Sequence, residues 1–340
     1  MSGTLQATIL KDGASSTNNL TFDSSGNVTV GNNLTVTGTT TLTGSLAGNP
    51  TTTGTYVMGS SFLRNRIING NMYVAQRGTS ATVTAGTTVP TSSTGYPCVD
   101  RWFVYSTGAN VTAAQVGGAG SNKNLLQVTG AASVTAVGIG QRIEQLNSYD
   151  LAGQTCTLSV NIANSLLTTV TWTASYANTA DTFGTIGTPT KTQIATGTFT
   201  VTSTLTQYTA NIAVPAAATT GIEILFTVGA QTSGTWQIGN AQLEVGTVAT
   251  PFERQIYSTQ LAQCQRYYET FTTGVTLSPS GVCYIPFFAN FATTKRATPT
   301  ITTQNVTSAT ATVNSIYAIG SLGTNSSSPS ASIFTASAEL

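Results

Sequence analysis

The stretch LTFDSSGNVTVGNNLTVTGTTTLTGSL, residues 20–46, decides how the N-terminal part of this chain folds. Its apolar residues come in short alternating pairs, and each pair ends at a turn rich in Gly, Asn or Ser, which is the pattern of short β-strands. Such short strands leave an apolar face and two edges open in water, and several identical chains winding together would bury them. We therefore predict an intertwined, oligomeric β-repeat shaft. Its apolar positions are Leu20, Phe22, Val28, Val30, Leu34 and Val36.

The composition of the whole chain favours an all-β protein with a sizeable core. Only 7% of its 340 residues are charged, against about a quarter in average proteins, whereas 40% are apolar. The formal net charge of +1 offers no basic surface for nucleic acid. No apolar run reaches the roughly 18 residues of a membrane span, and the N-terminus lacks the features of a signal peptide. We therefore expect synthesis in a cytoplasm, no nucleic-acid partner and no membrane insertion.

Shifts in composition predict five segments. Residues 1–19 form a polar leader, and residues 20–60 hold the repeats and a Gly/Thr linker. Residues 61–253 contain about a dozen short apolar segments, spaced as in a β-sandwich. Residues 254–269 carry apolar side chains at helical spacing and predict a short linking helix. Residues 270–340, with the strands GVCYIPFFANF and TPTITTQNV, are expected to form a small β tip domain whose aromatic cluster a neighbouring chain covers.

The chain contains no histidine, and this excludes most hydrolytic mechanisms. Ser-His-Asp and Cys-His arrangements and histidine-ligated zinc cannot be built from one chain. A glycosidase needs only two carboxylates, but the spacing of the acidic residues singles out no pair, and we expect surface or ion-pair roles for them. We therefore predict no catalytic residue and no enzyme, with a glycan depolymerase that uses a carboxylate pair as the alternative. Its candidate carboxylates are Asp100, Glu144, Asp150, Asp181, Glu223, Glu244 and Glu253.

The sequence also gives no sign of a metal or cofactor. The cysteines at 98, 156, 264 and 283 lie far apart without a CxxC motif, which indicates buried reduced thiols, with disulfides or metal binding as alternatives. The segment GGAGSNK, residues 117–123, is rich in glycine but satisfies neither phosphate-loop motif, so we expect a loop between strands.

Aromatic residues supply the candidate binding surfaces. Trp102 and Trp236 lie within apolar strands and are expected in the core. Trp172 and Tyr176 alternate with hydroxyl residues, so they could stack on a sugar or cap an edge of the sandwich. The predicted glycan or receptor contacts are Trp172, Tyr176, Tyr284, Phe287 and Phe288.

Four motifs occur in a characteristic order: NRIINGNMYVAQRGTS at 65–80, VDRWFVY at 99–105, GIGQRIEQLNSYDLAGQTCTLSVNI at 138–162 and a closing segment at 236–268 that contains LEVG and PFE. In these motifs the chain resembles a family of bacteriophage tail-fibre proteins. The resemblance covers about residues 62–270 and implies a jelly-roll domain similar to carbohydrate-binding modules. Related modules often hold calcium between the opening and closing strands, but here those places read Asn71, Met72, Tyr73, Gly239 and Asn240, without a carboxylate, and we do not expect calcium.

The resemblance and the repeats together predict a structural protein of the virion. We expect a homotrimeric tail fibre whose N-terminus binds a tail adaptor or baseplate protein and whose outer part adheres to a host-surface glycan or protein. The alternative within the same class is a head or collar fibre with a decorating role.

Overall fold

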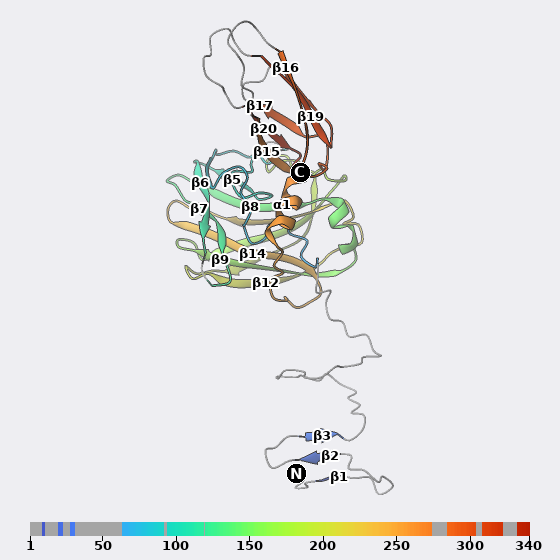
Figure 1. The fold of residues 1–340 in the computed structure, drawn as a ribbon. Coiled ribbons are helices and arrows are strands. Elements are labelled where there is room, and N and C mark those ends of the chain that lie inside the picture. Colours follow the sequence, from blue (N-terminus) through green and yellow to red (C-terminus); the bar gives the residue numbers. More distant parts are fainter. Residues whose placement is uncertain are drawn as a thin grey trace. The chain divides into compact units, whose positions relative to one another are not determined.

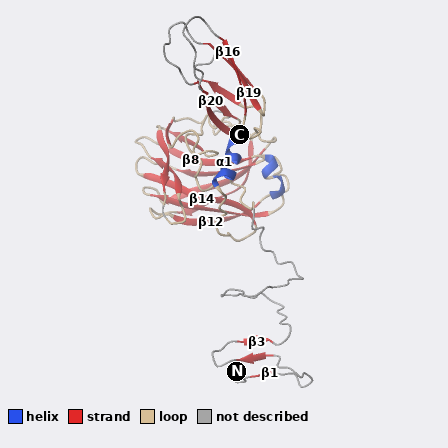
Figure 2. Cartoon of the chain, in the orientation of Figure 1, coloured by secondary structure: helices blue, strands red, loops and turns tan. Residues whose placement is uncertain are grey.

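The computed structural model describes residues 9–10, 20–22, 28–30, 63–91, 94–118, 120–273, 284–303, 308–321 and 332–340. The chain divides into two compact units, Met1–Tyr56 and Val57–Leu340. Strands provide most of the regular structure, and the described helices are one α-helix and two short 3-10 turns (Figure 2). The prediction of an all-β protein is confirmed.

The first unit contains three short antiparallel strands: β1 (Ile9–Leu10), β2 (Leu20–Phe22) and β3 (Val28–Val30). Strands β2 and β3 lie at two of the predicted apolar pairs, and Leu20 faces Val30 across them. The third predicted pair, Leu34 and Val36, lies outside the described residues. Val28 is 53% exposed in the single chain.

The second unit is built around two antiparallel sheets (Figure 1). The six-stranded sheet has the order β12 (Thr206–Ala213), β9 (Thr155–Asn164), β14 (Thr235–Val245), β7 (Asn124–Thr129), β6 (Val111–Gly117) and β4 (Ser80–Val83). The five-stranded sheet has the order β11 (Lys191–Thr200), β10 (Thr169–Ala177), β13 (Ile222–Val228), β8 (Ala136–Ile143) and β5 (Phe103–Thr107). The chain passes repeatedly from one sheet to the other, as in a jelly-roll sandwich.

The core lies between these sheets because inward and outward side chains alternate along each strand. On β9, for example, Cys156, Leu158, Val160 and Ile162 are buried in the core. Trp102 and Trp236 are fully buried there, as predicted.

Two smaller sheets follow the only α-helix of the described residues, α1 (Tyr257–Gln265), which lies within the predicted 254–269. One has the order β15 (Tyr268–Thr273), β20 (Ser332–Ser337) and β17 (Thr300–Thr303), and the other β16 (Tyr284–Asn290), β19 (Ser315–Ser321) and β18 (Ser308–Ala311). They enclose a small apolar cluster of Phe291, Ile316, Phe334 and Ala336. Strands β18, β19 and β20 lie in the Ser/Thr/Ala-rich part of the sequence, where apolar patterning alone predicted no strands.

The residues after β20 lie against the sandwich (Figure 1). The carboxylate of Glu339 pairs with Arg77 and Arg101. The Leu340 carbonyl accepts hydrogen bonds of 2.8 Å from Arg142 and 2.9 Å from the Tyr96 hydroxyl. Leu340 packs beside Phe183 and Tyr267 in a buried cluster. These contacts bind the end of the C-terminal segment to the sandwich.

Candidate functional site

The largest of three hollows described in the second unit is a cavity of about 790 Å³, which we call the amide pocket. It has a carboxamide side chain from each of three neighbouring strands, namely Asn161 on β9, Gln207 on β12 and Asn240 on β14. Asn161 and Gln207 are paired across β9 and β12 and alternate with inward residues, so they lie on the outer face of the six-stranded sheet. The rim comes from residues 120–122 and 204–205 and from Pro251, Phe252 and Arg254.

A bulge in β14 positions Asn240 in the amide pocket. In the pairing of β14 with β9, Gly239 lies opposite Asn161, and the next paired residue of β14, Gln242, lies opposite Ser159. At the bulge Asn240 has a φ of 45°, a conformation that asparagine tolerates better than most residues. Asn240 is 3% exposed, and its amide nitrogen donates a hydrogen bond of 3.3 Å to the Ser121 carbonyl.

Two amide oxygens at this pocket are left without a partner. The Asn161 amide nitrogen donates a hydrogen bond of 3.1 Å to the Asn122 side-chain oxygen. The side-chain oxygens of Asn161 and Asn240, however, are buried and accept no hydrogen bond from any residue in the described part of the chain. A buried acceptor without a donor costs about 1–3 kcal/mol, so both side chains favour a ligand that supplies hydroxyl or N–H groups.

An aromatic ring and a cation complete the wall. Phe252 is half-buried, and the Arg254 guanidinium lies 5.7 Å from the centre of its ring. Arg254 also donates a hydrogen bond to the Ser121 carbonyl, which ties residues 251–254 to the loop between β6 and β7. The described residues of this loop, 118 and 120–123, belong to the glycine-rich segment, and the expectation of a loop between strands is confirmed.

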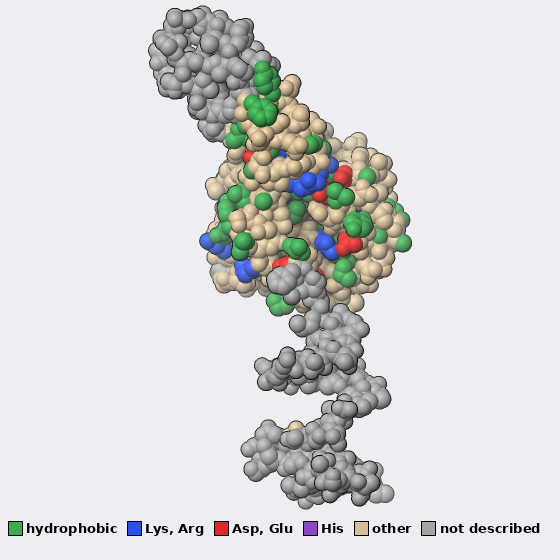
Figure 3. All heavy atoms as spheres, turned by 45° about the vertical axis from the view of Figure 1, so that its right-hand side comes forward, with side chains coloured by type: hydrophobic (Ala, Val, Ile, Leu, Met, Phe, Trp, Pro, Cys, Tyr) green, Lys and Arg blue, Asp and Glu red, His purple; other side chains and the backbone are tan. Residues whose placement is uncertain are grey.

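No carboxylate lines the amide pocket. Every acidic side chain that the structure describes is held elsewhere by a cation or by backbone N–H groups. The pairs are Asp100 with Arg77, Glu144 with Arg266, Asp150 with Arg66, Asp181 with Arg296, Glu223 with Arg142 and Lys191, Glu244 with Arg64, Glu253 with the N–H groups of Leu63 and Asn65, Glu269 with Lys295, and Glu339 with Arg77 and Arg101. On the face shown in Figure 3, charged side chains are few and several blue ones lie beside red ones.

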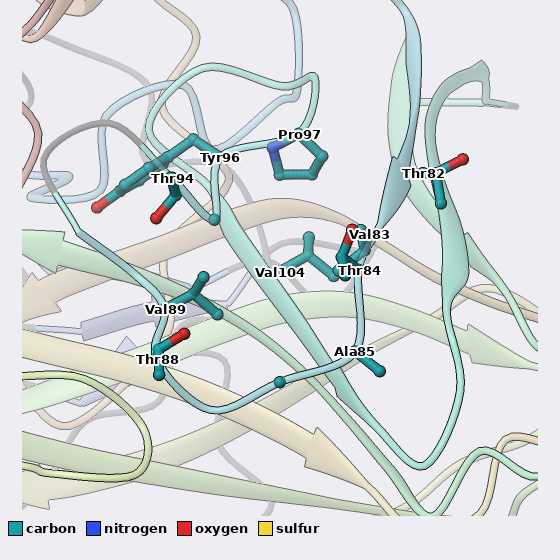
Figure 4. Close-up of a pocket in the computed structure, with 12 residues that line it drawn as sticks. Thr82, Val83, Thr84, Ala85, Thr88, Val89, Thr94, Tyr96, Pro97 and Val104 are labelled. Carbon is teal, nitrogen blue, oxygen red and sulfur yellow. The ribbon is translucent and has the colours of Figure 1, made fainter.

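A second hollow has a volume of about 360 Å³, and we call it the loop pocket. Its lining comes from the end of β4 and the loop after it, at residues 82–86, 88–89 and 94–97, and from Val104 on β5. Figure 4 shows apolar side chains such as Val89 and Val104 together with threonine hydroxyls around it. The loop is fixed in place because Val89 accepts a hydrogen bond of 2.9 Å from the Ile186 N–H. The Tyr96 hydroxyl at this pocket is already bound to Leu340, which leaves only threonine hydroxyls and backbone groups to bind a ligand.

The third hollow, of about 440 Å³, contains charged residues that already have partners. Arg266 pairs with Glu144 there, and Arg66 pairs with Asp150. These ion pairs account for the charged residues of the hollow without a ligand.

The prediction of Trp172 and Tyr176 as an exposed stacking pair requires correction. Trp172 is 7% exposed and belongs to the core, where its ring stacks 6.3 Å from Phe199. Phe199 stacks in turn on Tyr208 of the opposite sheet, at 5.4 Å. The alternation along β10 points Trp172 inward, and the threonines beside it face outward. Tyr176 is half-buried and packs against the same core.

The other predicted contact residues lie on a different element. Tyr284, Phe287 and Phe288 are all on β16. Phe288 is 64% exposed and is the cross-strand neighbour of Tyr317, which is 46% exposed. The structure therefore does not bring the five predicted aromatic residues together.

The amide pocket was not predicted from the sequence. Its polar residues are spread from Asn122 to Arg254 and follow no motif, and only the strand order β12–β9–β14 makes them neighbours.

The described residues contain no group of three or more His, Cys, Asp or Glu side chains that could hold a metal ion. Cys98, Cys156 and Cys264 are free and buried, whereas Cys283 lies outside the described residues. Within the described part of the chain, no helix is long and apolar enough to cross a membrane.

No protein-family model matches this chain, and no curated protein matches it. Among solved structures, it is similar to a CBM4 carbohydrate-binding module, with 14% identity over 52% of this chain and 98% of that chain and a TM-score of 0.35. It is also similar to the C-terminal family 22 carbohydrate-binding module of Clostridium thermocellum Xyn10B, with 18% identity over 44% of this chain and 89% of that chain and a TM-score of 0.30. A third similar structure is the enzymatically active domain of bacteriophage CBA120 tailspike protein 4, with 19% identity over 47% of this chain, 21% of that chain and a TM-score of 0.31.

Proposed function

We propose that this chain is a non-enzymatic subunit of a homotrimeric phage tail fibre and adheres to a host-surface glycan through the amide pocket. Its N-terminal residues attach the fibre to a tail adaptor or baseplate protein, and the mature protein is part of the virion. The ordered motifs from NGNM to PFE support the assignment to a fibre. The amide pocket is the observation that supports glycan binding.

The side chains of the amide pocket match the chemistry of a sugar. Each sugar hydroxyl both donates and accepts hydrogen bonds, and each carboxamide offers donors and an acceptor within one plane. The unpaired oxygens of Asn161 and Asn240 can accept from hydroxyl groups, and Gln207 is exposed at the same wall. The half-buried ring of Phe252 adds an apolar surface for the C–H face of a sugar ring.

The state of the carboxylates supports adhesion without hydrolysis. Glycoside hydrolysis needs a proton donor and a second free carboxylate within about 5–10 Å of it. Each described carboxylate is instead held by a cation or by backbone N–H groups, and none lies in the lining of the amide pocket.

A trimer would strengthen a weak site. Three linked copies convert millimolar contacts into durable attachment, because the second and third binding events become intramolecular. The exposed Val28 in the repeats and the exposed pair of Phe288 and Tyr317 on β16 and β19 offer apolar surface for contacts between chains.

The test is binding of the full-length protein to an array of bacterial surface polysaccharides. Gln207→Ala should weaken binding by about three- to tenfold, the value of one or two hydrogen bonds. Thr209→Ala is the matched control, since Thr209 is exposed on the same face of β12 but outside the pocket. If no polysaccharide binds, or if both variants lose binding equally, the amide pocket is not the adhesive site. Cross-linking of purified virions should join residues 1–19 to a tail protein, whereas a head or collar partner would contradict the tail assignment.

A further inference from the structure

Two cations stand apart from the others in the part of the chain that the structure describes. Among the lysine and arginine side chains of the described residues, every one except Lys123 and Arg254 lies within ion-pair distance of a carboxylate. In a chain with only 7% charged residues, this pairing is nearly complete. The two exceptions therefore require a separate explanation.

Both unpaired cations lie at the same loop. Arg254 lines the amide pocket and donates a hydrogen bond to the carbonyl of Ser121. Lys123 lies two residues after Ser121 in the same loop. Tyr73 holds Lys123 in place. The Lys123 ammonium group donates a hydrogen bond of 2.9 Å to the Tyr73 phenol oxygen and lies 4.8 Å from the centre of the Tyr73 ring. The Tyr73 ring is itself supported by an edge contact with Tyr257 at 5.2 Å.

Only neutral groups fix these two positive charges in place. Arg254 contacts a carbonyl oxygen and the ring of Phe252, and Lys123 contacts a phenol. The carboxylate next to Arg254 in sequence, Glu253, is bound to the backbone N–H groups of Leu63 and Asn65. This side of the amide pocket therefore carries positive charge that no described carboxylate neutralises.

We infer that the amide pocket recognises an acidic glycan, whose carboxylate or phosphate group binds Arg254 while Lys123, two residues after Ser121 in the same loop, adds positive charge nearby. This inference rests on the proposed function and specifies its ligand. The planar guanidinium offers paired N–H donors that match a carboxylate or phosphate, and the carboxamides of Asn161 and Asn240 bind the hydroxyl groups of the sugar. The absence of carboxylates in the lining avoids repulsion of such a ligand.

The test compares matched ligands that differ only in charge. Full-length protein is titrated with oligogalacturonate and with its methyl ester, and with phosphomannan and the same mannan after removal of phosphate. We expect an acidic member to bind at least about tenfold more tightly than its neutral partner, and added salt to weaken that binding. The pair that shows the difference identifies the anionic group as carboxylate or phosphate.

Variants then assign the effect to the two cations. Arg254→Gln and Lys123→Gln should each reduce binding of the acidic ligand, by about ten- to a hundredfold for Arg254→Gln, whereas Arg254→Lys should restore part of the loss. Arg66→Gln is the control, because it removes the same charge from an exposed ion pair with Asp150, away from the amide pocket. Thermal unfolding of each variant checks that the sandwich remains folded.

The outcomes separate the two proposals. Equal binding of neutral and acidic ligands that Gln207→Ala weakens but Arg254→Gln does not would overturn the acidic specificity and leave glycan adhesion standing. Loss of acidic binding in Arg66→Gln as large as in Arg254→Gln would assign the effect to net charge and also overturn the specificity. Failure to bind any carbohydrate on the array or in the titrations would overturn adhesion through this pocket.

Discussion

Arg101 and Glu339 form an ion pair although 238 positions separate them in the chain, and both side chains are buried, at 1% and 0% exposed. The Arg101 guanidinium also lies 3.5 Å from the centre of the Tyr267 ring, and Glu339 has a second partner in Arg77. Arg101 has a φ of 72°, an uncommon conformation for a residue other than glycine, in the turn just before β5 that contains the DRW motif. The pair therefore joins the last residues of the C-terminal segment to the middle of the sandwich.

Removal of this carboxylate should destabilise the second unit strongly. We expect Glu339→Gln to lower the free energy of unfolding by about 3–5 kcal/mol, because it leaves the buried Arg101 without its anion and leaves Arg77 with Asp100 alone. Asp150→Asn breaks the more exposed pair with Arg66 and should cost less than about 1 kcal/mol. Urea denaturation followed by tryptophan fluorescence measures both changes. Equal losses for the two variants would show that the buried pair adds no stability beyond that of a surface pair.

Buried thiols should make the sandwich sensitive to alkali. Burial raises the pKa of Cys98 and of Cys156 to about 11, from an ordinary value of 9.0. The unfolded chain therefore loses these protons first as the pH rises, so the folded state is stabilised fully below pH 9 and progressively less between about pH 9 and pH 11. Each thiol should account for about 2–3 kcal/mol of that loss.

The measurement is the free energy of unfolding as a function of pH for the wild type and for the double variant of Cys98→Ala and Cys156→Ala. The double variant should start lower because of the lost packing and should fall less steeply above pH 9. Parallel curves for the two proteins would exclude Cys98 and Cys156 as the cause. Burial also raises the pKa of Tyr267 to about 12, so part of the decline above pH 10 should persist in the variant.

A close backbone approach at Gly70 predicts a further effect on the amide pocket. A Cβ atom at Gly70 would lie 2.1 Å from the carbonyl oxygen of Ala241, the residue after Asn240 at the bulge. The two backbones are also hydrogen-bonded, since the Ala241 N–H donates 2.9 Å to the Gly70 carbonyl. Gly70→Ala should therefore cost about 1–3 kcal/mol of stability and weaken glycan binding through the displaced bulge.

Gly117→Ala is the control for this substitution, because a Cβ atom there meets no heavy atom within 4 Å. Calorimetry and glycan titration of both variants measure stability and affinity. A Gly70→Ala protein with normal stability and normal binding would contradict the tight contact between the NGNM turn and β14.

The sequence predicted those features that depend on local pattern. Alternating apolar residues placed the strands of the sandwich and the buried positions of Trp102 and Trp236, and helical spacing placed α1. For Trp172 the sequence did not decide between a sugar-stacking face and an edge of the sandwich, because alternation gives two faces but does not say which one meets the other sheet. Its burial follows from Phe199 and Tyr208, which strands β11 and β12 bring to the same part of the core.

Features that depend on distant segments could not be predicted in this way. The attachment of Glu339 to Arg101 leaves no local signal in the sequence, since a charged residue in a tail is usually solvated. The amide pocket is similar, because Asn122, Asn161 and Asn240 are each ordinary loop or strand residues until the sheet order makes them neighbours. The absence of a carboxylate partner for Lys123 and Arg254 among the described residues likewise becomes visible only in the structure.

Removal of residues 1–60 should separate assembly from adhesion. The second compact unit begins at Val57, and the described core of the sandwich starts at Ile67, so the truncated protein should remain folded with an unchanged melting temperature for that unit.

Full-length protein should have three times the chain mass of 34.9 kDa by light scattering, and the truncated protein should be a monomer if the repeats hold the trimer together. A truncated protein that is still trimeric would assign assembly to the C-terminal sheets, where Phe288→Ser and Tyr317→Ser should then dissociate it. A monomeric full-length protein would contradict the fibre, and an unfolded truncated protein would contradict the independence of the two units.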